Sequence, residues 1–499
     1  MRKIDKIIYI IIFGVLVHPL FAEQRTVVLT LHSAVRIAMD NSYRIRQLRL
    51  GIERTRHWLK AERAGLKSSF YMNIKAPEIS NLSEYKWNST TQRDELVRQN
   101  TQRVQMDISV KQPVILFGYP TNGYLSLNNQ TYRYIQKFGQ DEEINYYNRF
   151  FIKFEQPFFR PNTLKNNIEM AELNLERQES DYITDQVNYL EQIADDYYRL
   201  FKLTYLNTIY EQKIDNLKRV VRIVDRISRE DTTRSIEAIQ VQVELANTEE
   251  KLLQNKSELR LATARLKQRL RLDDDVEVQI DSDVKIIPVE IDEEQAIHFG
   301  LTLRPSMRNL DNQRRRDEID LENVKGWNSF HMNLELTYGL EKQEDSYRQL
   351  LRDNEDSNSA TLKAYIPLWD WGQRHERIEA YKIDLKRVDL SREETRTRIE
   401  SEIRNAISNL REYQERAINM QGNLSMATEI TGQSITLYQK GKISLQDLLQ
   451  SLSRQTETSL NFLDTYLGYR QSLLTLMNNT YYDYENNVSL LDQFELAEY

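Results

Sequence analysis

Apolar residues recur at spacings of three and four over a long stretch in the middle of the chain, with charged residues between them. This pattern predicts an amphipathic helix suited to coiled-coil packing. It is clearest at Ile183, Val187, Leu190, Ile193, Tyr197 and Phe201. We expect one helix from about 163 to 228, roughly 100 Å long at a rise of about 1.5 Å per residue. A break at 228–235 and a second periodic run at 236–272 then predict an antiparallel helical hairpin.

Glycine and proline, which interrupt helices, are missing from this part of the chain. The 126 residues between Pro161 and Pro288 include neither, which few globular folds tolerate. The C-terminal half repeats the plan with a helical run from about 374 to 440. We expect that run to end at Gly441, which can take the left-handed conformation, and a further helix to run from 445 to about 477 with Ser444 as its N-cap.

Other segments alternate apolar and polar side chains with the period of two that is typical of a β-strand. The longest apolar row is Phe330, Met332, Leu334, Leu336 and Tyr338. Residues 70–75 and 104–111 follow the same pattern, and 150–154 and 362–366 follow it more weakly. One apolar and one polar face suits a transmembrane barrel with lipid outside and water inside. The same faces would suit a half-buried sheet in a soluble protein.

The N-terminus favours the membrane interpretation, because it has the form of an export signal. Arg2, Lys3 and Lys6 precede an apolar run at 7–17, and a plausible cleavage region ends after Ala22. A membrane-anchored start is the other interpretation, although the run is too short to span a bilayer. An exported chain without other apolar helices can cross lipid only as a closed barrel, because the backbone must be satisfied there. Trp369 and Trp371, close to a strand end, suit an interfacial aromatic belt.

Residues 103–112 and 123–134 are predicted to form an additional strand hairpin. If it crosses the membrane, the chain contributes six strands rather than four; a hairpin outside the membrane is the competing interpretation. The polar segments 78–101 and 341–358 lack periodicity, and we expect them to be extracellular loops.

A five-residue segment recurs in the two halves of the chain. Ser-Phe-Tyr-Met-Asn at 69–73 returns as Ser-Phe-His-Met-Asn at 329–333, displaced by 260 residues. Each copy follows a helical segment, at about 31–65 and 292–326, and precedes strands and a long helical hairpin. The matching order of elements predicts a tandem duplication.

Composition narrows the possible chemistry. The chain has no Cys, which excludes disulfides, thiolate metal sites and cysteine nucleophiles. A formal charge of −7 argues against nucleic acid as a partner. The five histidines after the signal show no metal-ligand spacing, and no phosphate-binding glycine motif occurs. These histidines are His32, His57, His298, His331 and His375. Nothing in the sequence identifies an enzyme, a metal site or a cofactor.

Three segments carry a resemblance to a known family. Residues 154–159 and 366–374 are similar to the strand-to-helix segment of the TolC-like outer membrane efflux proteins, which ends in Pro-Leu-Phe-Asp-x-Gly, and 438–449 is similar to that family's second helical tip. The resemblance covers about 29–480, except for an insertion near 78–144.

The resemblance implies a mainly α fold with a membrane β-barrel part. Tandem-duplicated helical hairpins would form an α-barrel tunnel, and strands from three chains would form one shared barrel. The divisions expected are a signal peptide at 1–22, a first repeat at 23–280, a second repeat at 281–480 and a C-terminal tail at 481–499. The first repeat would hold strands at about 69–157 and a helical hairpin at 163–272, and the second would hold strands at about 329–367 and a hairpin at 374–477.

The resemblance also implies a function and partners. The chain would be a homotrimer in the outer membrane of a Gram-negative bacterium, in contact with its lipid. Its periplasmic tip would dock on an adaptor that links it to an inner-membrane transporter. The channel would conduct substrates passively and need no cofactor.

In the family, acidic side chains and a tyrosine close the periplasmic tip. Matching the motif places Asp447 at a gate aspartate, Tyr438 at the gate tyrosine and Gln450 where a second aspartate usually stands. Three copies of Asp447 in a narrow ring would repel one another and attract cations. An acid in the first turn of a helix, favoured by the helix dipole, is the simpler interpretation.

The first tip departs further from the family, with Glu237 at the acidic position and Arg234 where a hydroxyl residue normally stands. We expect adaptor contacts around 228–237 and 440–447, including Gly441 and Ser444. A periplasmic coiled-coil adaptor or scaffold is the alternative, although it should lack duplicated strands. A polysaccharide-binding or enzymatic periplasmic protein is a third possibility, disfavoured because no cluster of aromatic and acidic residues interrupts the helices.

Overall fold

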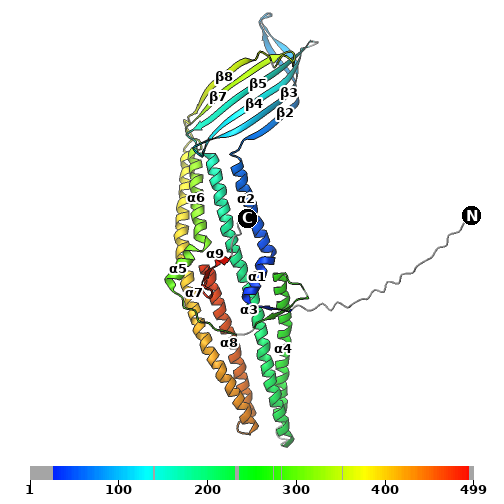
Figure 1. Ribbon diagram of the computed structural model, residues 1–499, viewed down its shortest axis with the longest axis vertical. Coiled ribbons are helices and arrows are strands. Elements are labelled where there is room, and N and C mark those ends of the chain that lie inside the picture. Colours follow the sequence, from blue (N-terminus) through cyan, green and yellow to red (C-terminus); the bar gives the residue numbers. More distant parts are fainter. Residues whose placement is uncertain are drawn as a thin grey trace, which may run out of the picture. The chain divides into compact units, whose positions relative to one another are not determined.

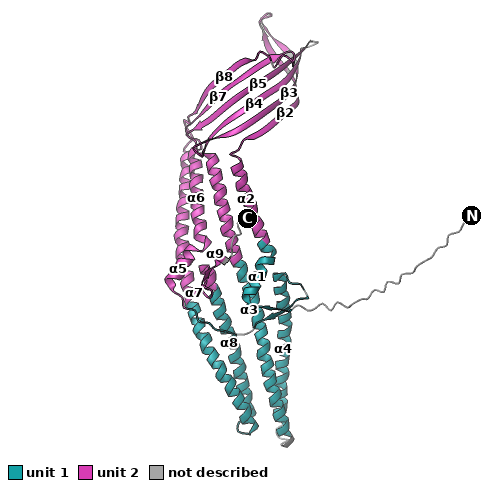
Figure 2. Cartoon of the chain, in the orientation of Figure 1, with its two compact units in different colours: residues 1–45, 188–289, 408–474 teal, residues 46–187, 290–407, 475–499 magenta. Residues whose placement is uncertain are grey.

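The computed structural model describes residues 26–138, 141–230, 235–273, 275–281, 284–350 and 352–493. The predicted signal peptide at 1–22 lies outside them. Two compact units divide the chain, and each draws on both halves of the sequence (Figure 2). The first unit comprises residues 1–45, 188–289 and 408–474, and the second comprises 46–187, 290–407 and 475–499.

The second unit contains one antiparallel sheet of six strands in the order β2-β3-β4-β5-β7-β8 (Figure 1). Its strands are β2 Ser69–Asn88, β3 Arg93–Leu116, β4 Tyr119–Phe138, β5 Asp141–Phe158, β7 His331–Glu344 and β8 Glu355–Tyr365. The additional hairpin is therefore part of the sheet, because β3 pairs with β2 and β4 pairs with β5.

The predicted alternation gives this sheet one apolar face. A single cross-strand row joins Phe70, Val110, Leu127, Ile152 and Tyr338. Phe70 is 72% exposed and Leu362, on the same face, is 58% exposed. The next row along the strands carries polar groups on the opposite face, among them Ser109, which donates a 2.6 Å hydrogen bond to Asn128.

The prediction of a loop at 78–101 is wrong. These residues form the outer part of the β2–β3 hairpin, in register from Glu78 opposite Arg103 to Asn88 opposite Arg93. Among the described residues, the part of β3 before Asn100 pairs only with β2, so 82–99 is a two-stranded ribbon. Apolar alternation is needed only where one face avoids water, which explains why this polar ribbon has no such signal. The expected loop at 341–358 is shorter, since β7 continues to Glu344 and β8 begins at Glu355.

The helices of the second unit continue from one end of the sheet (Figure 1). They include α2 Tyr43–Ala64, α5 Glu293–Thr302, α6 Pro305–Gly326 and the first part of α3 Thr163–Glu230 and of α7 Gln373–Gln439. Helix α3 runs antiparallel to α2 and to α6. Arg315 of α6 meets Glu169 of α3 at 2.5 Å, and Arg308 meets Glu176 at 2.6 Å. Residues 481–493 form the short strands β9 Tyr482–Asp483 and β10 Val488–Ser489 and the one-turn helix α9 Leu490–Gln493.

The first unit consists mainly of two helical hairpins. The predicted runs at 163–228 and 236–272 are present as α3 and α4 Ser235–Leu270, and the C-terminal runs are α7 and α8 Leu445–Thr480. Lys213 pairs with Glu244 at 2.6 Å and Asn207 with Asn255 at 2.7 Å, so α3 and α4 are antiparallel. The remaining elements are α1 Leu31–Asn41 and the strands β1 Thr26–Leu29 and β6 Glu277–Ile280, which pair in parallel.

One hydrophobic core joins the two hairpins near their tips. It is formed by Leu217, Val220, Val224, Val241, Tyr438, Leu445, Leu448 and Leu452. These side chains come from all four long helices, so the tips are held together within a single chain.

Candidate functional site

The second helical tip is built from two capping motifs. Gly441 has φ of +68°, and its amide donates to the Tyr438 carbonyl at 2.9 Å. The Lys442 amide donates to the Leu437 carbonyl at 3.0 Å, which completes a Schellman motif. The predicted helix end at Gly441 is confirmed, and its physical basis is the left-handed conformation that glycine adopts without a Cβ penalty.

Ser444 and Asp447 cap α8 reciprocally. The Asp447 amide donates to Ser444 Oγ at 3.2 Å, while the Ser444 amide and hydroxyl donate to Asp447 Oδ2 at 3.2 and 2.7 Å. These hydrogen bonds, the one from the hydroxyl foremost, hold the pKa of the exposed Asp447 carboxyl below its ordinary value. Asp447 is therefore a charged, solvent-facing carboxylate, which fits both the gate and the simple capping interpretation.

Tyr438 and Glu237 connect the two tips. Tyr438 is only 1% exposed, and its hydroxyl group donates a 2.7 Å hydrogen bond to Glu237 Oε2. Glu237 lies in the first turn of α4. Two candidate residues that the sequence placed in separate tips thus share one bond. No pattern in the sequence could have indicated it, because 201 positions separate them.

The other candidates lie at the surface of the second tip or outside the described residues. Gln450, Gly441 and Ser444 are exposed. Arg234 lies outside the described residues, which at the first tip end at Glu230 and resume at Ser235. Exposure is compatible with docking and does not by itself indicate a partner.

The strand-to-helix motif is a capping device as well. Asp370 accepts hydrogen bonds from the amides of Gly372 and Arg374 at 3.0 and 3.1 Å, and from the Asn328 side chain at 3.1 Å. The backbone bond from Arg374 contributes most to lowering the pKa of the Asp370 carboxyl. The sequence showed the motif, but its role in starting α7 is evident only from these bonds.

In the first half of the chain, an asparagine of the additional hairpin caps the helix that follows the sheet. Asn122, just after the β3–β4 turn, accepts a 3.2 Å hydrogen bond from the Leu164 amide at the start of α3. Its side-chain amide donates to the Pro161 carbonyl at 2.6 Å. The hairpin is thereby fixed to the helix that follows the sheet.

Across the part of the chain that the structure describes, no three His, Asp or Glu side chains are grouped so that they could hold a metal ion. Among the described helices, none combines the length and apolarity needed to cross a bilayer.

Comparison with solved structures defines the class of fold. The chain is similar to the CmeC outer membrane channel of Campylobacter jejuni, with 14% identity, a TM-score of 0.64, and coverage of 90% of this chain and 85% of that one. It is also similar to VceC of Vibrio cholerae (12% identity, TM-score 0.62, coverage 90% and 95%) and to the open state of the Neisseria gonorrhoeae MtrE channel (12%, 0.61, 90% and 88%). The fold is that of the outer membrane efflux channels.

The sequence agrees with this class over part of its length. Residues 331–480 match the family model of the outer membrane efflux proteins. The family match covers this part of the chain, and the similarity of fold extends over 90% of the whole chain. No curated protein sequence matches the chain.

Proposed function

We propose that the chain is the exit duct of a tripartite efflux or secretion system. Three copies would form one channel in the outer membrane of a Gram-negative bacterium. The duct would conduct substrates passively from a periplasmic adaptor and an inner-membrane transporter to the exterior. The observation that carries the proposal is a six-stranded sheet with an exposed apolar face, in a chain whose fold is that of efflux channels.

The exposure of the apolar face supports the proposal that lipid surrounds this side of the sheet. Phe70, Met72, Ile74, Leu336 and Leu362 are each at least 40% exposed on that face. Soluble monomers rarely leave so large a contiguous apolar surface in water. In a bilayer the same surface would be solvated by acyl chains, while the polar face lined water.

The two edge strands of the sheet support assembly from several copies. In the described part of the chain, β2 and β8 pair on one side only. Open edges cannot persist in lipid, because their backbone groups would lack hydrogen bonds. Closure by three copies would join β8 of one to β2 of the next and give a barrel of eighteen strands, three times the six of one chain.

The tips are proposed as the gate and the adaptor-docking surface. Asp447, Tyr438 and Gln450 would lie at the gate, and Arg234, Glu237, Gly441 and Ser444 would take part in docking. A threefold ring of Asp447 would concentrate cations in a narrow entrance. The two-repeat division, 23–280 and 281–480, belongs to the same proposal, with each repeat contributing one helical hairpin to the tunnel.

Conductance of the purified protein in a planar bilayer tests the proposal, with Asp447→Ala beside Glu457→Ala as a control of equal charge change at an exposed position of α8. We expect stable pores that divalent cations block, loss of the block in Asp447→Ala, and an unchanged block in the control. A protein that stays soluble without detergent and forms no pores would refute the channel and favour a periplasmic scaffold. Pores whose divalent block survives in Asp447→Ala would refute the gate alone.

A further inference from the structure

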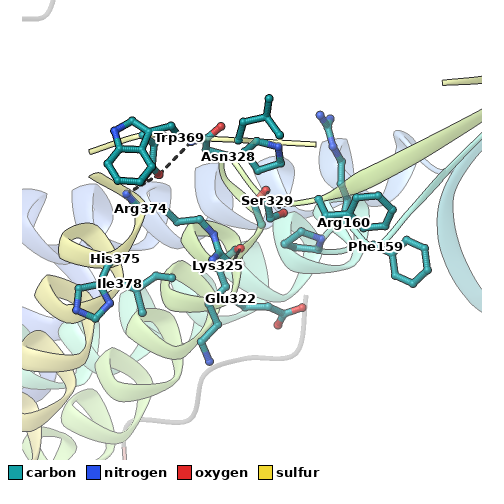
Figure 3. A pocket seen from close by; sticks show the side chains of 16 residues that line it. Phe159, Arg160, Glu322, Lys325, Asn328, Ser329, Trp369, Arg374, His375 and Ile378 are labelled. Atoms are coloured by element: carbon teal, nitrogen blue, oxygen red, sulfur yellow. Dashed lines mark hydrogen bonds between the residues drawn. The ribbon is translucent and has the colours of Figure 1, made fainter. Parts of the chain in front are cut away.

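An open pocket of about 860 Å³ lies where the sheet meets the helices of the second unit (Figure 3). Its walls come from the segment between β5 and α3, the end of α6, the segment that leads into β7, the segment between β8 and α7, and the start of α7. We call it the junction pocket. None of the candidate residues of the helical tips lines it.

Cationic side chains line the junction pocket in excess of acidic ones. Arg160, Lys325 and Arg374 line it together with two acidic residues, Glu322 and Asp370. Asp370 is already occupied as the cap of α7. No described residue forms an ion pair with Arg160 or Lys325, so neither charge is neutralised by a carboxylate contact within the chain as described.

Arg160 is held in place by a neutral partner instead. One of its Nη atoms lies 2.6 Å from His331 Nε2. Because a guanidinium has only donors, Nε2 must accept, and Nδ1 then donates to the Ser329 carbonyl at 3.0 Å. Both contacts fit one uncharged tautomer of His331, whose ring also stacks on Tyr365 at 4.9 Å. The arrangement orients Arg160 while leaving its positive charge uncompensated.

Large apolar side chains line the pocket beside these cations. Leu368 is 89% exposed, and Phe159 and Trp369 are also exposed, as is Trp371, which lies next to Trp369 outside the lining. The two tryptophans pack edge to face with ring centroids 5.6 Å apart. Exposed Trp beside Arg and Lys, at the end of strands with an apolar face, is the combination found where proteins meet lipid headgroups.

We infer that the junction pocket binds the phosphate headgroup of an anionic phospholipid, with Arg160, Lys325 and Arg374 as the donors. This inference rests on the proposed function, since it requires the sheet to lie in a membrane. Arginine suits phosphate oxygens because its planar donors can bind two of them at once. Trp369 and Trp371 would lie at the level of the lipid carbonyls, and the acyl chains would extend along the apolar face of the sheet.

Membrane lipid rather than free phosphate is the occupant we commit to. An isolated phosphate would use the cations but leave the exposed Leu368 and Trp369 of the pocket without a function. A phospholipid satisfies both features of the pocket with one molecule. Phe330, the first side chain of the apolar row at 330–338, lines the pocket as well.

The test measures binding of phosphatidylglycerol to the detergent-purified full chain by native mass spectrometry, with phosphatidylcholine and inorganic phosphate as comparison ligands. The variant is Arg160→Gln/Lys325→Gln. The control is Lys60→Gln/Lys386→Gln, which removes the same charge from exposed positions outside the pocket. A basic residue at an anionic membrane surface contributes roughly a fivefold gain in affinity. We therefore expect phosphatidylglycerol binding to be about twenty-five-fold weaker in the variant and unchanged in the control.

Three outcomes would overturn the inference. They are equal loss in the control, no loss in the pocket variant, and inorganic phosphate binding as tightly as the lipid. Quenching of tryptophan fluorescence by brominated lipid should also fall in Trp369→Phe/Trp371→Phe. Unchanged quenching would show that the two tryptophans do not contact the lipid. If the channel conducts in bilayers but lipid binding ignores the pocket variant, the inference fails while the proposed function stands. If no channel forms, the proposed function itself has failed.

Discussion

Gly326, the last residue of α6, lies so close to Pro161 that a Cβ atom on the glycine would be 2.1 Å from the proline Cδ. The proline Cγ would be 2.4 Å away. A proline ring cannot turn aside as a flexible side chain can. The end of α6 therefore approaches the segment before α3 only because position 326 has no side chain.

Replacing Gly326 with alanine should destabilise the second unit. The added methyl group must push apart two rigid segments, and overpacking of this kind costs about 1–3 kcal/mol. Thermal unfolding followed by circular dichroism in detergent measures the loss. Gly432→Ala is the matched control, since Gly432 lies within α7 and a Cβ atom there would meet no described atom within 4 Å. There the better helix propensity of alanine should raise stability by up to about 1 kcal/mol. Equal effects at the two sites would contradict the packing argument.

Removal of the Tyr438 hydroxyl should weaken the link between the two tips. In Tyr438→Phe the buried ring is kept, and the hydrogen bond to the Glu237 carboxylate is lost. A bond to a charged group contributes about 1.5–3 kcal/mol, and we expect the lower end because Glu237 is partly exposed. A double-mutant cycle with Glu237→Ala isolates the pair. Additive effects of the two single changes would show that the bond does not couple the tips.

The additional hairpin should depend on Asn122 for its attachment to α3. Asn122 has φ of +62°, so Asn122→Gly preserves the backbone while removing the side-chain bonds to Pro161 and Leu164. We expect a loss of about 1–3 kcal/mol and faster proteolysis near the β3–β4 turn. Asn122→Asp keeps the acceptor for the Leu164 amide and should lose less. If both variants behave like the original protein, the side chain does not fasten the hairpin.

Acid should weaken the contact between α3 and α6. The hydrogen bond from Arg315 lowers the pKa of the Glu169 carboxyl in the folded chain. A lowered folded pKa means that the stabilisation is complete above the unfolded pKa of about 4.3 and is lost as the pH falls through the folded value. The difference in melting temperature between the original protein and Glu169→Gln should therefore be largest near neutral pH and shrink below about pH 4. Glu457→Gln, which changes an exposed carboxylate of α8, provides the baseline. A difference that grows on acidification would refute the role of this pair.

The sequence was sufficient for the helices and their ends because their determinants are local. Gly441 and Ser444 act within one turn of their own positions, and the absence of glycine and proline between Pro161 and Pro288 needs no tertiary information. Apolar alternation likewise located the strands that present an apolar face. It could not reveal the ribbon at 82–99, because a strand with water on both sides is under no constraint to alternate.

The sequence could not predict contacts between residues that lie far apart in the chain. Nothing in the spacing of Tyr438 and Glu237 distinguishes them from other tyrosines and glutamates of the helices. Arg160 and His331 meet only because β5 and β7 are neighbours in the sheet, a pairing that skips the five elements between them in the chain. The repeated segment at 329–333 marked where β7 begins, but not that its histidine would orient an arginine.

The unequal lengths of the two outermost strands set the outline of the proposed assembly. β2 has 20 residues and β8 has 11, so a seam between copies can cover only part of β2. The ribbon at 82–99 would rise past each seam with no neighbouring copy beside it. The outer mouth would then be notched, with three separate polar prongs around the opening. A large molecule approaching from outside would meet the tips of those prongs before it reached any continuous wall.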